Sequence, residues 1–164
     1  MTPTLVPIDL NAIGNAATTE PRVAGCPVVD GALPPAVILE QARAALQAGL
    51  PSLWFAPFAF VSEGRVVGSG GFKGPPRAGV VELGYGVARA ERGRGVATAA
   101  VLCLCRMAFD QAEVATVTAE TVVPNIASQR VLEKAGFTRV GTRDTTEDGT
   151  VIQWRLQRGD VRGW

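Results

Sequence analysis

The residues of this chain best suited to chemistry lie in one short turn, residues 92–97 (RGRGVA), between a predicted strand and a long apolar helix. The first N–H groups of such a helix have no partner within the helix and carry the positive end of its dipole. Gly93 and Gly95 let a ligand approach the backbone closely, and Arg92 and Arg94 add charge that matches phosphate oxygens. The pattern predicts a phosphate site, with an ordinary strand-to-helix turn as the alternative.

The acid–base groups of the chain are restricted, because its 164 residues include no histidine. A general base must therefore be a carboxylate, a lysine, a tyrosine, a cysteine or a water. Three cysteines are present, Cys26, Cys103 and Cys105, without CxxC spacing, and we interpret them as buried free thiols. Scattered cysteines without histidine do not form the ligand set of a metal site, so none is predicted.

Composition limits the partners of the chain. Hydrophobic residues make up 47% and charged residues 19% of it, which predicts one folded domain over residues 1–164. A net charge of +1 provides no basic excess for nucleic acid. No apolar run approaches the roughly 20 residues that cross a bilayer, and the first residues lack the features of a signal peptide. We therefore expect a cytoplasmic protein that binds neither nucleic acid nor membrane.

The elements before the turn are predicted from hydrophobic periodicity and from turn residues. A short strand is expected at residues 5–10, followed by loop or irregular helix over residues 11–33. Pro34 then starts an amphipathic helix that ends at Gly49. Three strands follow, of which the first two form a hairpin. They are expected at residues 53–61, 65–72 and 80–87.

The elements after the turn complete a mixed arrangement. Polar and apolar side chains alternate over residues 116–121, which predicts a strand with one polar face. Asn125 is placed to cap a helix that Gly136 ends. Two β-prone segments, 138–145 and 150–157, form a closing hairpin. The order β, α, β-β-β, α, β, α, β-β predicts a single α/β domain.

Two common phosphate-binding motifs fit the turn poorly. Gly93-x-Gly95 followed by Thr98 is a broken GxGxxG without an early βαβ unit around it, so a dinucleotide fold is not predicted. A Walker loop is excluded because the chain has no Gly-Lys-Ser or Gly-Lys-Thr.

A third motif matches better. Residues 92–97 fit Arg-x-x-Gly-x-Ala, preceded by residues 82–87 (ELGYGV) and followed by residues 125–128 (NIAS) and 133–137 (EKAGF). Together these segments resemble the GNAT N-acetyltransferase superfamily, in the branch similar to the RimJ and RimL ribosomal-protein N-acetyltransferases. The resemblance covers residues 53–157 and implies the GNAT acyl-CoA N-acyltransferase fold, a mixed central sheet with splayed parallel strands flanked by helices.

The resemblance implies acetyl-CoA as co-substrate. It would lie between the parallel strands 80–87 and 115–122, where Gly84 and Gly86 leave room for it. Its pantetheine arm would pair with exposed backbone like an added strand, and its pyrophosphate would rest on the turn. The residues thereby assigned to the cofactor are Val87, Ala88, Arg89, Arg92, Gly93, Arg94, Gly95, Val96, Ala97, Thr98, Asn125 and Ser128.

The implied reaction is attack of an amine on the thioester, which needs a base for the amine proton. By resemblance, the first candidate base is Glu120, five positions before Asn125 and on the polar face of its strand. Glu82, on the facing strand, is the second candidate and would act directly or through water. A surface salt bridge is the alternative for either carboxylate.

The departing thiolate also needs a partner. Many relatives carry a tyrosine seven positions after the asparagine, where this chain has Leu132. Ser128 is the nearest replacement by resemblance, although it could be only part of the helix cap. We interpret Tyr85, the only tyrosine, as a core residue.

These expectations combine into an N-acetyltransferase that transfers acetyl from acetyl-CoA to a primary amine by direct attack in a ternary complex. The acceptor, a peptide N-terminus or a small-molecule amine, stays open, as does the choice between monomer and homodimer. Two other functions also stay open. One is a non-catalytic acyl-CoA-binding or interaction module on the same fold, and the other is a nucleotide-phosphate binder.

Overall fold

We describe a computed structural model of the chain over residues 2–13 and 20–161. The strands are β1 (Thr4–Pro7), β2 (Arg22–Val23), β3 (Cys26–Pro27), β4 (Phe58–Ser62), β5 (Arg65–Phe72), β6 (Val80–Val87), β7 (Thr116–Val122), β8 (Thr138–Thr145) and β9 (Gly149–Gln157). Seven of them form one sheet in the order β1-β4-β5-β6-β7-β9-β8, while β2 and β3 pair separately. In the large sheet β6 and β7 are parallel, and the other neighbours are antiparallel.

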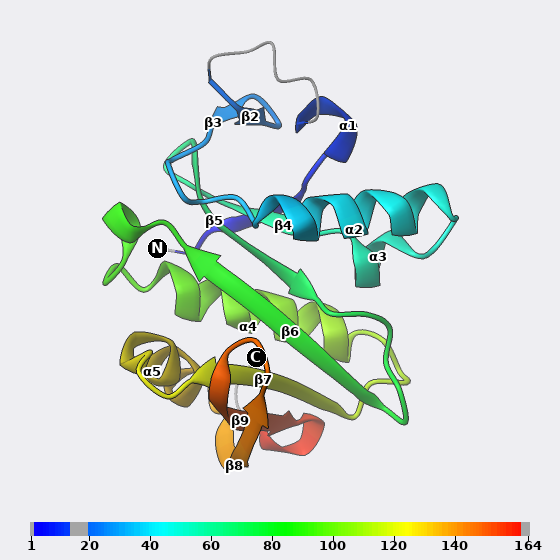
Figure 1. Cartoon of the computed structure of the whole chain (residues 1–164), viewed down its shortest axis with the longest axis vertical. Coiled ribbons are helices and arrows are strands. Elements are labelled where there is room, and N and C mark those ends of the chain that lie inside the picture. Colours follow the sequence, from blue (N-terminus) through cyan, green and yellow to red (C-terminus); the bar gives the residue numbers. More distant parts are fainter. Residues whose placement is uncertain (1, 14–19, 162–164) are drawn as a thin grey trace.

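The helices pack around this sheet. Figure 1 shows α4 (Val96–Phe109) crossing behind β6, with α5 (Ile126–Lys134) beside the first turn of α4. The helices are α1 (Leu10–Ile13), α2 (Ala36–Gln47), α3 (Ser52–Phe55), α4 (Val96–Phe109) and α5 (Ile126–Lys134), with 3-10 turns η1 (Arg89–Glu91) and η2 (Arg158–Asp160).

The apolar character of α4 has a simple cause, because this helix lies in the core. Val101, Leu104, Cys105 and Ala108 are fully buried, as expected of a helix that is apolar on nearly every side. The core therefore fixes α4 against β6, and with it the turn that joins the two elements.

Most predicted elements are confirmed, but the strand predicted over residues 53–61 begins later. Residues 53–55 belong to the short helix α3. Pro51 caps this helix, and Ala56 is extended (φ −90, ψ 133) because the residue before a proline, here Pro57, avoids helical conformation. The two prolines therefore override the β-propensity of the aromatic residues between them.

The N-terminal prediction is also wrong in its bounds. β1 ends at Pro7 rather than at residue 10, and Leu10 begins α1. The Asp9 carboxylate accepts the N–H of Asn11 at 3.0 Å, which is the capping interaction that starts a helix. Of the loop or irregular helix predicted over residues 11–33, residues 14–19 lie outside the described residues.

None of the helices in the described part of the chain is both long and apolar enough to cross a membrane.

Candidate active site

The parallel strands β6 and β7 pair over three positions and then diverge. Residues 80–82 lie in register with residues 116–118. Further along, in the described part of the chain, β6 pairs only with β5 and β7 only with β9. Backbone groups of β6 are thereby left without a strand partner on the side of β7, where an extended ligand could pair with them. The predicted splayed parallel strands are confirmed.

The turn between β6 and α4 adopts a backbone conformation that favours glycine. Gly93 and Gly95 have φ values of +77° and +78°. Gly95 caps α4, and its carbonyl accepts the Ala99 N–H at 3.1 Å. The N–H groups of the first turn of α4 therefore have no helical partner. A Cβ added at either glycine would meet nothing within 4 Å, so the space above this backbone is open.

A cavity of about 340 Å³ lies over the turn and reaches α5. We call it the donor cavity. Its lining includes most of the residues that the resemblance assigned to the cofactor, namely Val87, Arg92, Gly93, Gly95, Val96, Ala97, Thr98, Asn125 and Ser128. The lining also includes seven residues outside that assignment, Tyr85, Gly86, Glu91, Ala127, Arg130, Val131 and Lys134. The last three repeat at helical spacing on α5, which is the signal that could have found them.

Three residues assigned to the cofactor lie outside the lining of this cavity, and each has another environment. Ala88 is buried and its N–H donates to the Val67 carbonyl at 2.8 Å. Arg89 is exposed in the 3-10 turn η1. The Arg94 guanidinium pairs with two carboxylates, one of which, Glu91, itself lines the cavity.

Those carboxylates belong to Glu91 and Glu63. Glu91 is only 5% exposed, and its oxygens lie 2.7 Å from Arg94 Nη1 and 3.0 Å from Arg65 Nη2. Arg94 Nη2 also lies 3.4 Å from Glu63 Oε2. The hydrogen bond to Glu91, followed by the charges of Glu63 and Glu91, raises the pKa of Arg94. This ion-pair network joins the turn to β5 and to the β4–β5 hairpin, and it compensates the buried charge of Glu91.

Tyr85 links the donor cavity to α5. Its ring packs against the core, while its Oη lies 2.8 Å from Ser128 Oγ and donates to the Ser128 carbonyl at 3.1 Å. Burial raises the pKa of Tyr85 to about 12, and the hydrogen bond to Ser128 opposes the rise. The phenol is therefore protonated at neutral pH. The interpretation of Tyr85 as a core residue describes its ring but not its hydroxyl.

The surroundings of Ser128 explain how it can serve two purposes. Its backbone N–H donates to Asn125 Oδ1 at 3.1 Å, which confirms the predicted cap of α5. Its hydroxyl faces Tyr85 within the donor cavity. Leu132, at the position where many relatives carry a tyrosine, is fully buried.

The two candidate bases lie on one face of the sheet. Glu82 is in register with Thr118, two positions before Glu120 on β7, and side chains two apart share a face. Glu82 Oε1 lies 3.2 Å from Lys73 Nζ. Both carboxylate oxygens of Glu120 accept hydrogen bonds from Arg143. Arg143 Nη2 donates to Oε1 at 2.9 Å and to Oε2 at 2.8 Å, and Arg143 Nε donates to Oε1 at 3.1 Å. Their side chains are 29% and 18% exposed, respectively.

A second cavity, of about 540 Å³, adjoins the donor cavity and shares Tyr85, Gly86, Val87 and Arg92 with it. We call it the side cavity. Glycines of β5 and β6 form part of its wall, and an added Cβ at Gly86 would meet nothing within 4 Å. The remaining lining residues are Gly31, Ala32, Leu33, Pro34, Pro35, Ile38, Pro57, Ser69, Gly70, Gly71, Phe72, Lys73 and Gly84.

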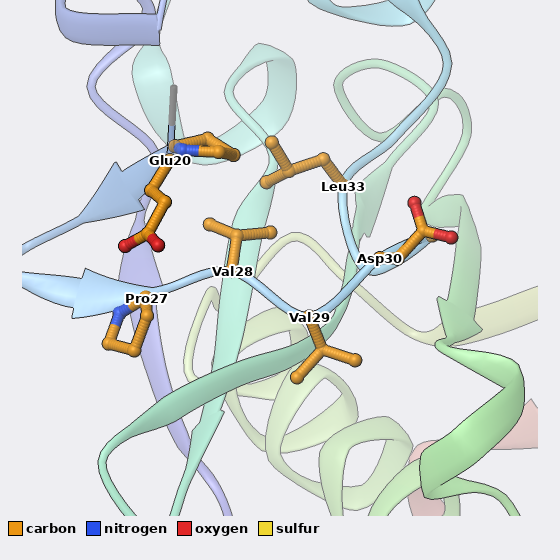
Figure 2. A pocket seen from close by; sticks show the side chains of 8 residues that line it. Glu20, Pro27, Val28, Val29, Asp30 and Leu33 are labelled. Atoms are coloured by element: carbon orange, nitrogen blue, oxygen red, sulfur yellow. The ribbon is translucent and has the colours of Figure 1, made fainter. Parts of the chain in front are cut away.

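A third cavity, of about 570 Å³, lies beside β3 and the loop that follows it. Figure 2 shows Val28, Val29 and Leu33 along it, with the carboxylates of Glu20 and Asp30 on opposite sides. None of the predicted catalytic or cofactor residues lines this cavity. Within residues 2–13 and 20–161, no group of cysteine, aspartate and glutamate side chains is arranged to hold a metal.

Comparison with known proteins agrees with this geometry. Residues 4–138 match the family described as "Acetyltransferase (GNAT) domain". The chain is 34% identical over 74 residues to "Uncharacterized N-acetyltransferase YjdG" of Bacillus subtilis (strain 168), and this match spans 44% of each chain. The chain thus spans less than half of that relative's length.

Solved structures share the fold. Aminoglycoside acetyltransferase AAC(6')-Ib in complex with coenzyme A is 25% identical, with a TM-score of 0.57 over 64% of this chain and 67% of that one. RimJ of Mycobacterium smegmatis in complex with CoA-disulfide is 21% identical, with a TM-score of 0.66 over 77% of this chain and 62% of that one. The strands β6 and β7 diverge beside the glycine turn (residues 92–97), and the family match covers residues 4–138. We conclude that the chain belongs to the GNAT acetyltransferase family.

Proposed function

We propose that this chain transfers the acetyl group of acetyl-CoA to a primary amine by direct attack. The observation that carries the proposal is the meeting of the donor cavity and the side cavity at Tyr85, Gly86 and Val87, beside the point where β6 and β7 part. A donor in one cavity and an acceptor in the other would meet along this strand. Such juxtaposition replaces a bimolecular encounter by a reaction within one complex.

In this proposal the donor is held mainly by backbone. The pyrophosphate rests on the N–H groups at the start of α4, where the helix dipole favours an anion. The pantetheine arm pairs with the side of β6 that β7 has left. This mode is supported by the open space above Gly93 and Gly95 and by the missing strand partner.

We assign the base role to Glu82. The other candidate, Glu120, already accepts three hydrogen bonds from the Arg143 guanidinium, so an incoming amine would have to displace that guanidinium to reach the carboxylate oxygens. Within the described part of the chain, Glu82 has a single partner, Lys73, and it is the more exposed of the two carboxylates. Its position in the last parallel pair places it where the strands part.

Two glutamine variants test this assignment. Glu82→Gln should lower kcat by about 100-fold or more, the usual worth of a general base, while the Kd for acetyl-CoA stays within about twofold. Glu120→Gln should lower kcat by less than about tenfold, because the amide can still accept from Arg143. If Glu120→Gln is the more damaging variant, the base role belongs to Glu120.

We assign the thiolate partner to the Tyr85–Ser128 pair. The Tyr85 phenol keeps its proton at neutral pH, since its pKa is about 12. It lies 2.8 Å from Ser128 Oγ, so one hydroxyl can hydrogen-bond the departing sulfur while the other supports it. The amine proton goes to Glu82, the C–S bond breaks as the C–N bond forms, and the thiolate leaves toward this pair.

Direct attack is favoured over an acetyl-cysteine intermediate. None of the three cysteines, Cys26, Cys103 and Cys105, lines the donor or the side cavity. Burial also raises the pKa of the Cys105 thiol, which disfavours the nucleophilic thiolate. Initial-rate plots against both substrates should therefore intersect, whereas parallel lines would indicate a covalent acetyl-enzyme.

We infer that the side cavity receives the acceptor. Among the residues that the structure describes, its ionisable lining residues are Lys73, Tyr85 and Arg92, and no carboxylate lines it. Leu33, Ile38 and Phe72 add apolar surface. This chemistry favours an amine flanked by apolar groups over a polycation, since like charges in a partly enclosed site repel. Leucine amide should thus show a higher kcat/KM than spermidine or kanamycin, and the reverse order would contradict this acceptor class.

The rival function is a non-catalytic acyl-CoA-binding module on the same fold. The observation that favours it is the buried Leu132, which stands where many relatives carry a tyrosine. A thiol-release assay with acetyl-CoA and a panel of amines separates the two functions. Release that depends on an amine supports the transferase. Tight acetyl-CoA binding without release across the panel supports the module.

A further inference from the structure

Two cations on α5 face the donor cavity and have no partner among the residues that the structure describes. Arg130 and Lys134 both line this cavity, and both are exposed. Neither side chain forms a hydrogen bond or salt bridge with another described residue. Arg65, Lys73 and Arg143, in contrast, are each paired with a carboxylate.

The spacing of these two cations makes them one site. Residues four apart on a helix lie on the same face, one turn from each other. Val131, next to Arg130 on α5, also lines the donor cavity. The glycine turn lines another part of the same cavity. The cavity thus has two different anion-binding walls. One is made of helical N–H groups, and the other is made of an arginine fork and an ammonium.

The donor carries two different phosphate groups that these walls can separate. CoA has a pyrophosphate bridge and, apart from it, a phosphate monoester on the ribose. A phosphate monoester carries a charge of about −1.5 to −2 at neutral pH. Arginine presents paired donors that match phosphate oxygens, and lysine adds a compact charge.

We propose that Arg130 and Lys134 bind the ribose 3′-phosphate of CoA and so distinguish CoA from dephospho-CoA. The proposal rests on the proposed function, in that the glycine turn must hold the pyrophosphate for the monoester to reach α5. It goes beyond that function because it assigns a separate recognition site to a part of the donor that does not react.

Calorimetry with CoA and with 3′-dephospho-CoA tests the proposal without any acceptor amine. The wild type should bind CoA about tenfold more tightly than dephospho-CoA, as expected for losing contacts with two cations. In the double variant Arg130→Gln and Lys134→Gln this preference should fall below about twofold, chiefly through weaker binding of CoA. The affinity for dephospho-CoA should change little.

A matched control removes two positive charges elsewhere. Arg77 and Arg139 are exposed and line neither cavity, so Arg77→Gln with Arg139→Gln should keep the full preference for CoA. Equal binding of both ligands by the wild type would overturn the 3′-phosphate site alone. So would a double variant that weakens both ligands equally, which would place the cations on the pyrophosphate. Failure of both ligands to bind the wild type would overturn the proposed function as well.

Discussion

The donor cavity and the side cavity meet at Tyr85, yet the chain builds them in opposite ways. The donor cavity comes from one stretch, residues 85–98, and one face of α5. The side cavity collects residues from the loop over residues 31–35, from α2 and from β5 and β6. A site made from one local motif can be predicted from sequence, whereas a site made from distant segments depends on the whole fold.

The difference also concerns which atoms bind. In the proposed donor site, the binding groups at the glycine turn are backbone N–H groups, which every residue type except proline supplies once glycine permits the conformation. In the side cavity the lining depends on side chains such as Leu33, Ile38 and Phe72, and their identity sets the shape and polarity. The family motif therefore fixes the donor while leaving the acceptor free to vary.

The largest expected effect on donor binding tests the backbone nature of the proposed donor site. Gly95→Val places a branched side chain above the N–H groups of the turn, at a φ of +78°. We expect the Kd for acetyl-CoA, measured by calorimetry, to rise about 30-fold, since a phosphate could no longer approach the backbone and the loop is strained by about 1–2 kcal/mol.

The control for this prediction carries the same strain elsewhere. Gly49 has a φ of +77°, and a Cβ added to it would also meet nothing within 4 Å. Gly49→Val should therefore lower the free energy of unfolding by a similar amount, about 1–2 kcal/mol, but leave the Kd for acetyl-CoA unchanged. Equal loss of affinity in both variants would show that strain, and not the blocked backbone, weakens binding.

A smaller effect is expected on the other side of the comparison. Gly84, which the resemblance placed beside acetyl-CoA, lines the side cavity but not the donor cavity, and a Cβ there would contact only Lys73 Cε, at 3.6 Å. Gly84→Val should raise the KM for the amine acceptor about tenfold by filling this space, with the Kd for acetyl-CoA unchanged. The strand glycine Gly141 lines neither cavity, so Gly141→Val should alter neither constant.

If Gly84→Val instead weakens acetyl-CoA and leaves the acceptor KM unchanged, the two cavities exchange roles. That result would also remove the basis for choosing the acceptor class from the side cavity.

The sequence predicts local features of this fold better than it predicts where side chains turn. Asn125 at the cap of α5 and the buried α4 follow from local rules and are confirmed. Residues 53–55 form a helix because Pro51 and Pro57 override strand propensity. The Arg94 side chain contacts Glu91, three positions away, and also Glu63 in the turn between β4 and β5. A local rule could suggest the first contact, but the second depends on how distant segments fold together.

Tyr85 lines both cavities, and its loss should affect the reaction more than either binding step. Tyr85→Phe keeps the ring in the core and removes the hydroxyl that lies 2.8 Å from Ser128 Oγ. We expect kcat to fall about fivefold, an effect typical of one lost hydrogen bond, with the Kd for acetyl-CoA and the acceptor KM nearly unchanged. An unaltered kcat would remove the Tyr85–Ser128 pair from the mechanism.

The pKa of Tyr85 gives the same variant a signature in alkaline unfolding. Its pKa is about 12 in the folded chain against 10.0 as the ordinary value, so the folded state binds the phenol proton more tightly. The resulting stability is complete below pH 10 and is lost as the pH rises toward 12. Urea unfolding at pH 9 and pH 11.5 should show a larger loss of stability in the wild type than in Tyr85→Phe. Cys105 is present in both proteins, so its titration cancels in the difference.

The smallest expected effect separates the two arginines of the turn. Arg92 lines both cavities, and its Nε donates to the Val87 carbonyl at 3.2 Å. Arg94 lines neither cavity and pairs with Glu63 and Glu91.

Arg92→Gln should raise the Kd for acetyl-CoA about threefold to fivefold, as expected for one exposed charge near phosphate. Arg94→Gln should change it by less than about twofold, because Arg65 still compensates Glu91. A larger loss in Arg94→Gln than in Arg92→Gln would show that the ion-pair network, rather than the direct contact of Arg92, sets the affinity of the donor site.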